Sequence, residues 1–164
     1  MPPIATQSEH ETSATASMRC LLFAAGGRLF GCDIGAVREI IPIRRATRLP
    51  GAPDFVMGLI NVRGSVVTVI DLVRRFGGAE ADRVDGSIII ADFGTRTVGL
   101  AVDAMRDVQF VVPRSVDTGG AAAIAAGLPA SVVTGMADST EGLAILLDVG
   151  TVLRQVMTSA EGES

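Results

Sequence analysis

Few side chains in this 164-residue sequence are of the kinds that carry out acid–base or nucleophilic chemistry. The single histidine, His10, lies in a polar N-terminal stretch, and tyrosine and tryptophan do not occur. No further histidine could activate a cysteine or a serine, and a zinc site of the Cys/His type would have too few ligands. Two glycine-rich patterns that bind phosphate are absent from the sequence. One is GxxxxGK followed by Ser or Thr, and the other is GxGxxG after a strand. The sequence predicts no catalytic residue, no metal site and no cofactor.

Carboxylates remain as candidates, because several aspartates stand where expected strands end. They are Asp33, Asp71, Asp92, Asp103 and Asp148. An aspartate at a strand end more often forms a turn or caps a helix than acts as an acid catalyst. Asp71, followed by Leu72, and Asp148 each precede an apolar helical pattern. Both are therefore predicted as helix N-caps.

The most informative polar side chains lie in the stretch VMGLINVRGSVVTVIDL, residues 56–72. Two apolar runs flank an Arg63-Gly64 turn, which predicts a hairpin in which Gly64 bends freely. Asn61 and Arg63 place strong hydrogen-bonding groups beside that turn. Two interpretations follow from these residues, a core hairpin with a polar corner or a binding site.

The elements around this hairpin are expected to be short strands joined by glycine turns. Strands are predicted at 18–25, 28–34, 40–43, 56–62, 66–70, 87–93, 97–102, 105–112, 131–136 and 143–147. A short helical turn is expected at 35–39, a helix after Asp71, and a terminal helix after Asp148. Residues 79–86 are expected to be a loop, and 118–127 either a loop or a weak helix. Residues 1–17 and 158–164 are predicted as flexible tails around one domain, 18–157.

The second half of the chain repeats the first. Residues 27–40 align with 95–108 without a gap, and VMGLI…VIDL aligns with VTGMA…LLDV. Two copies of one small antiparallel unit predict two packed β-barrels related by a pseudo-twofold axis. At the hairpin turn NVRG corresponds to DSTE, so Arg63 has no counterpart. A charge that is present in only one half of the repeat is explained more easily by a binding partner than by a requirement of folding.

Composition narrows the class of protein further. An apolar content of 48% and a mean hydropathy of +0.45 allow a substantial core, yet no apolar run has the roughly 18 residues of a membrane span. The N-terminus lacks the features of a secretory signal, so a cytoplasmic location is expected. Cys20 and Cys32 are then expected to be free core thiols. The charge of −4 argues against nucleic acid, although clustered arginines could contact an acidic protein surface.

Together these residues resemble a known family. The runs GGRLFG, VREII, RLPGAP, FVMGLINVRG and VIDLVRRFG are similar to the CheW-like domain of bacterial chemotaxis, from about residue 19 to 157. The resemblance implies two five-stranded, SH3-like β-barrels. It also implies a non-catalytic adaptor that binds the cytoplasmic tip of a chemoreceptor and the regulatory domain of a CheA-type histidine kinase.

By motif position, the resemblance implies a receptor-binding groove. Its residues would be Val37, Glu39, Gly58, Asn61, Arg63 and Gly64. A helical tip could lie in an apolar groove between the barrels while rim charges set its register. Glu39 and Arg63 could instead, or as well, form a structural ion pair. Alternatives to a chemotaxis adaptor are a subunit of a non-flagellar array, such as one for pilus motility, and a β-barrel ligand carrier or enzyme using Asp71 or Asp148.

Overall fold

The computed structural model describes residues 17–75, 86–114 and 127–162. Most of the N-terminal stretch, of the loop expected at 79–86 and of the Ala/Gly-rich segment expected at 118–127 lies outside these ranges. The first half contains β1 (Met18–Ala25), β2 (Arg28–Asp33), η1 (Ile34–Ala36), β3 (Glu39–Pro42), β4 (Val56–Val62), β5 (Ser65–Asp71) and α2 (Leu72–Arg75). The second half contains β6 (Ser87–Phe93), β7 (Arg96–Val102), β8 (Ala104–Val111), η2 (Ala130–Val132), β9 (Val133–Ser139), β10 (Gly142–Leu147) and α4 (Val149–Gly162).

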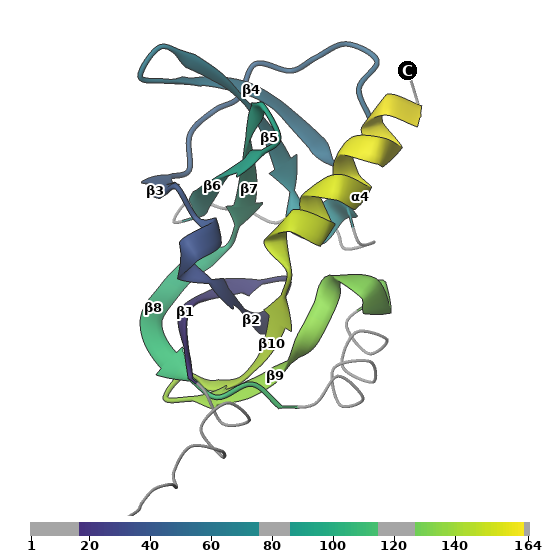
Figure 1. Cartoon of the computed structure of the whole chain (residues 1–164). Helices are drawn as coiled ribbons and strands as arrows, with labels where there is room; N and C mark the ends of the chain where they lie inside the picture. The colour runs from purple at the N-terminus through teal and green to yellow at the C-terminus, as the bar shows by residue number, and fades with distance from the viewer. Residues whose placement is uncertain (1–16, 76–85, 115–126, 163–164) are drawn as a thin grey trace, which may run out of the picture.

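The strands form two five-stranded sheets, which confirms the predicted architecture (Figure 1). We call β8-β1-β2-β10-β9 the first sheet and β3-β6-β7-β5-β4 the second sheet. Each sheet takes strands from both halves of the chain, and the two orders correspond when repeat-related strands are exchanged. The hairpins are antiparallel, while β2 with β10 and β5 with β7 pair in parallel. The barrels are therefore intertwined.

Two glycines show how closely the repeat is reproduced in packing. A Cβ added at Gly31 would lie 2.5 Å from Cys20 Sγ, and one added at Gly99 would lie 2.6 Å from Ile88 Cγ2. Real Cβ atoms do not approach other atoms so closely, so both positions need a residue without a side chain. Cys20 and Ile88 are themselves equivalent in the repeat. The same requirement for space recurs at the same point of each sheet.

The core has three parts. A small apolar cluster lies within each sheet, around Leu22 and Leu146 in the first and around Val69 and Ile88 in the second. The largest cluster combines residues of both sheets with α4, which packs beside them (Figure 1). Burial of one helical face by both sheets holds the barrels together. The apolar stripe predicted for this helix is confirmed as buried and consists of Val149, Val152, Leu153 and Val156.

Some element bounds differ from those expected. Glu39 begins β3 instead of ending a helical turn, because η1 already stops at Ala36. β9 begins at Val133, since η2 occupies residues 130–132 and the Val132 N–H donates to the Pro129 carbonyl. A tail was expected from residue 158, yet α4 continues to Gly162. No glycine or proline interrupts residues 151–161, so nothing in that stretch breaks the helix.

Both cysteines are free and buried, as predicted. Cys20 belongs to the small cluster of the first sheet, and Cys32 to the cluster between the sheets. Burial raises the pKa of Cys20 to about 11 and that of Cys32 to about 12. Both side chains therefore remain protonated thiols at neutral pH.

Candidate binding site

The turn between β4 and β5 holds an unusual backbone conformation. Arg63 has φ +51° and Gly64 has φ +86°, and among the described residues Arg63 is the non-glycine with a positive φ. A two-residue hairpin turn with both φ angles positive suits glycine, whereas an arginine there is strained by about 1 kcal/mol. Asn61 Oδ1 accepts from the Gly64 N–H at 3.0 Å, and Arg44 Nη1 donates to the Asn61 carbonyl at 3.0 Å. Asn61 thus holds the turn in shape.

The Arg63 guanidinium lies against Glu39 on β3. Arg63 Nη1 donates to Glu39 Oε1, so the ion pair left open by the sequence is present. The Arg63 side chain is 75% exposed and that of Glu39 25% exposed. An exposed pair of this kind contributes about 0.2–1 kcal/mol to stability. Its larger effect is to fix the direction of a guanidinium that still faces solvent.

A cavity of about 130 Å³ lies beside this pair on the second sheet. It is lined by Arg38, Glu39, Val62, Arg63, Ser65, Val67, Ile90 and Thr97. Val67 and Ile90 are buried and form its apolar part. Because these residues come from β3 to β7, the cavity belongs to one barrel, whereas the largest apolar cluster fills the space between the barrels.

A second polar contact at this cavity was not expected from the sequence. Arg38 Nη1 donates to Asp92 Oδ1 at 3.1 Å and to Thr97 Oγ1 at 3.2 Å. Part of this contact could have been predicted from the hairpin about Gly94, because its register places Asp92 opposite Thr97. Arg38 lies directly before β3, which pairs with β6, and so reaches this pair. Asp92 is thus held in a surface hydrogen-bond network.

Of the six predicted groove residues, Glu39 and Arg63 line the cavity, Asn61 and Gly64 belong to the adjoining turn, and the other two have different roles. A Cβ added at Gly58 would lie 2.2 Å from the Thr47 carbonyl oxygen, and Gly58 has φ +138°. Thr47 and Leu59 exchange backbone hydrogen bonds of 2.8 Å beside it, so Gly58 permits a close backbone contact. Val37 packs against the cluster between the sheets. The structure therefore brings together Glu39, Asn61, Arg63 and Gly64.

The two predicted helix caps are confirmed, and they are equivalent. Asp71 Oδ1 accepts from the Arg74 N–H at 3.1 Å, and Asp148 Oδ1 accepts from the Thr151 N–H at 3.2 Å. Each aspartate also donates its own N–H, to the Phe55 and Val132 carbonyls respectively. Leu72 is buried directly after the first cap. These contacts give both aspartates a structural role.

At the equivalent place on the first sheet, a group of side-chain hydrogen bonds replaces the ion pair. Gln109 Nε2 donates to Asp107 Oδ2 at 2.9 Å and also to Thr140 Oγ1, and the Thr140 N–H donates to Gln109 Oε1 at 3.1 Å. Hydrogen bonds from Gln109 and from the Val108 N–H lower the pKa of Asp107. Thr140 occupies the position of Arg63 in the repeat. The two barrels thus share a scaffold and differ in the charge at this corner.

Neither a metal site nor a spanning helix emerges from the described residues. Within residues 17–75, 86–114 and 127–162, no three His, Cys, Asp or Glu side chains gather as metal ligands would. In the same ranges, no helix is long and apolar enough to cross a membrane.

The fold and the cavity define a two-barrel β protein with a preoriented surface charge on one barrel. Residues 19–157 match the family model of the CheW-like domain. The chain belongs to the CheW-like domain family.

Known proteins of this kind are similar along most of the chain. It is 31% identical over 140 residues to the chemotaxis protein CheW of Klebsiella aerogenes, covering 85% of this chain and 83% of that protein. It is 40% identical over 97 residues to CheW of Rhizobium meliloti, covering 58% and 63%. The crystal structure of the scaffolding protein TtCheW from Thermoanaerobacter tengcongensis superposes with a TM-score of 0.67 at 28% identity, covering 80% of this chain and 89% of that one.

Proposed function

We propose that this chain is a non-catalytic adaptor that couples chemoreceptors to a CheA-type histidine kinase in chemotaxis signalling. The observation that supports this most directly is the CheW-like match over residues 19–157, together with the similarity to a scaffolding protein of the same fold. Its partners would be the cytoplasmic tip of a chemoreceptor and the regulatory domain of the kinase, and its place of action the cytoplasm.

The receptor would bind at the Glu39–Arg63 corner of the second sheet. Arg63 Nη1 donates to Glu39, and the guanidinium of this side chain, which is 75% exposed, still offers further N–H donors to a partner carboxylate. Because Glu39 holds the guanidinium in place, less side-chain entropy is lost on binding. The cavity beside it, with Val67 and Ile90 in its lining, would take an apolar side chain from a receptor helix.

Binding to two baits tests this proposal. A receptor signalling-tip fragment and the regulatory domain of a CheA-type kinase from the same genome are immobilised, and affinities are measured for the wild type and for Arg63→Glu. Charge reversal should weaken receptor binding about tenfold or more and leave kinase binding unchanged. Arg19→Glu, an equal charge change at an exposed residue of the first sheet, is the matched control.

The outcomes separate the function from the site. If the wild type binds neither bait, the adaptor function is wrong. If Arg63→Glu, folded by circular dichroism, binds the receptor fragment as tightly as the wild type, the site is wrong. An equal loss for Arg19→Glu would also refute the site, because net charge alone would then explain the effect.

A further inference from the structure

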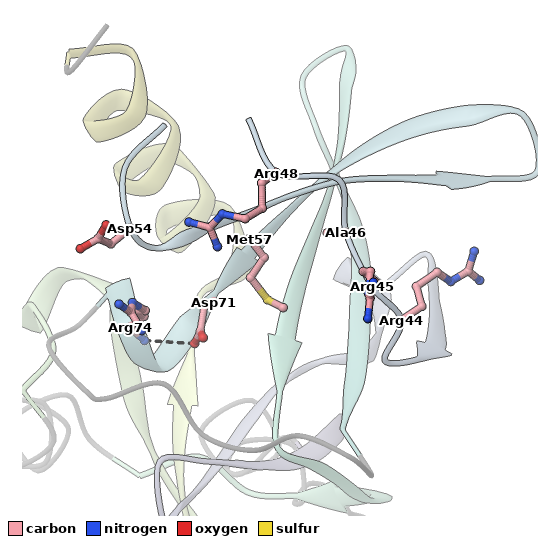
Figure 2. Close-up of a pocket in the computed structure, with 8 residues that line it drawn as sticks. All are labelled: Arg44, Arg45, Ala46, Arg48, Asp54, Met57, Asp71 and Arg74. Carbon is pink, nitrogen blue, oxygen red and sulfur yellow. Dashed lines mark hydrogen bonds between the residues drawn. The ribbon is translucent and has the colours of Figure 1, made fainter. Parts of the chain in front are cut away.

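A second charged surface lies apart from the Glu39–Arg63 cavity. The connection from β3 to β4 carries Arg44, Arg45 and Arg48, and together with Arg74 of α2 these line a cavity of about 330 Å³ (Figure 2). We call it the arginine pocket. Its remaining lining residues are Ala46, Asp54, Met57 and Asp71. Four guanidinium groups and two carboxylates give this pocket a local positive charge in a protein whose net charge is −4.

Folding does not account for Arg45 and Arg48. Arg44 holds the Asn61 carbonyl, but no hydrogen bond or ion pair to another described residue holds Arg45 or Arg48. Both side chains are exposed. Neighbouring like charges repel, so such a cluster tends to destabilise the free protein.

The internal repeat supplies a comparison. In the second half, the equivalent connection spans residues 112–132 and contains a single arginine, Arg114. Arg114 Nη2 is paired with Asp138 Oδ2. The second half of the chain thus forms its hairpin, β9–β10, without a cluster of arginines in the segment that precedes it. The extra arginines belong to the first half alone, as Arg63 does.

The directions of the side chains indicate the kind of ligand. Figure 2 shows Arg48 and Arg44 pointing to opposite sides of the connection, with Arg45 between them. A single phosphate or carboxylate cannot contact groups that diverge in this way, whereas an extended segment with several carboxylates can. Arginine binds carboxylates through paired N–H donors, and the half-buried Met57 adds an adaptable apolar contact.

We propose that the arginine pocket is a docking site for an acidic, extended segment of a partner protein. The pocket adjoins the proposed receptor-binding corner, because Arg44 donates to the Asn61 carbonyl, whereas Arg45 and Arg48 lie outside that corner. The proposal does not rest on receptor binding there. Electrostatic attraction of this kind raises the association rate and orients the partner, and it weakens as salt is added. Arg45 and Arg48 make the main contacts, and Arg44 extends the row.

A defined acidic probe tests the proposal with the full chain. Fluorescein-labelled hexaglutamate is titrated with protein at about 20 mM and about 300 mM NaCl, and binding is followed by fluorescence anisotropy. The double variant Arg45→Glu/Arg48→Glu should bind about tenfold more weakly at low salt, and high salt should remove most of the difference. The matched control is Arg19→Glu/Arg106→Glu, which makes the same charge change at exposed residues of β1 and β8 and should bind like the wild type.

Several results would overturn the proposal. One is the absence of hexaglutamate binding by the wild type at low salt, and another is an equal loss in the two double variants. Stronger binding of inorganic phosphate or tripolyphosphate than of hexaglutamate, measured by competition, would show a phosphate site instead. Because Arg45 and Arg48 are exposed and belong to a cluster of like charges, their replacement should not lower the urea unfolding midpoint, and a large decrease would refute the claim that folding does not need them.

Discussion

Replacing Arg63 by glycine should separate the contribution of this residue to binding from its contribution to stability. Arg63 adopts φ +51°, which an L-residue other than glycine, asparagine or aspartate rarely does. Arg63→Gly removes both the ion pair with Glu39 and the steric strain of the backbone. Arg63→Ala removes the ion pair and keeps the strain. The two variants therefore differ in backbone conformation energy alone, to a first approximation.

The expected magnitudes follow from the exposure and the dihedral angle. The ion pair is largely exposed on the Arg63 side and contributes about 0.2–1 kcal/mol, so Arg63→Ala should destabilise by about that amount. Relief of the left-handed conformation favours glycine by about 1 kcal/mol over alanine. Arg63→Gly should therefore be as stable as the wild type or slightly more stable. For a domain of this size, the gap between the variants corresponds to a Tm difference of about 3–5 °C.

Urea unfolding and receptor binding, measured on the same preparations, test this expectation. Unfolding midpoints at constant m-value give the order of stability, and affinity for the receptor-tip fragment gives the functional effect. We expect both variants to lose affinity to a similar extent although their stabilities differ. Arg63→Gly less stable than Arg63→Ala would refute the backbone argument. Unchanged affinity in both variants would refute the proposed role of the guanidinium.

Two further predictions concern the core. The chain has no lysine and no tyrosine, so Cys20 and Cys32 are the side chains that titrate between about pH 8.5 and 12. Both thiols have raised pKa values in the folded state, about 11 for Cys20 and about 12 for Cys32. The contribution of these thiols to the free energy of unfolding is therefore complete below the ordinary cysteine pKa, and it is lost as the pH rises through the pKa values of the folded state. At pH 10.5 the free energy of unfolding should be lower than at pH 8 by about 2 kcal/mol for each thiol, and a Cys20→Ala/Cys32→Ala variant that kept this decline would contradict the assignment. Separately, Gly31→Ala should destabilise by about 1–3 kcal/mol, because its Cβ would lie 2.5 Å from Cys20 Sγ. Adding Cys20→Ala removes that sulfur and should recover part of the loss in urea unfolding, whereas strictly additive effects would show that the two positions are not in contact.

Much of the fold could be predicted because its signals are local and occur twice. Alternating apolar residues, glycine turns and aspartate caps indicate each strand and helix within a few residues, and the repeat indicates the pseudo-twofold relation. The exchange of strands between the two sheets was harder to predict from the sequence. Parallel pairing of β2 with β10 and of β5 with β7 joins segments far apart in the chain, and the local pattern of an antiparallel hairpin contains no information about it.

The candidate site was predictable in its residue types and less so in its contacts. Arg63 stood out as a charge at a turn, and its partner Glu39 could be named only as one of two possibilities. The contacts of Arg38 were not expected, because its acceptors Asp92 and Thr97 lie on β6 and β7, far from it in the chain. Gly58 was placed in the groove on motif position, yet what sets it apart is a backbone contact with Thr47 that no local pattern reveals.

The repeat makes the chain its own control for distinguishing folding from function. Features present in both halves, such as the close-packed Gly31 and Gly99 and the capping Asp71 and Asp148, are those the common scaffold needs. Features present in one half must have another cause, because the other half folds into an equivalent sheet without them. Arg63, whose equivalent Thr140 is an uncharged residue that accepts a hydrogen bond from Gln109, meets this criterion although its backbone is strained. Arg45 and Arg48 of the arginine pocket meet it as well, and because they do not line the Glu39–Arg63 cavity, we assign the two groups of residues to two different contacts.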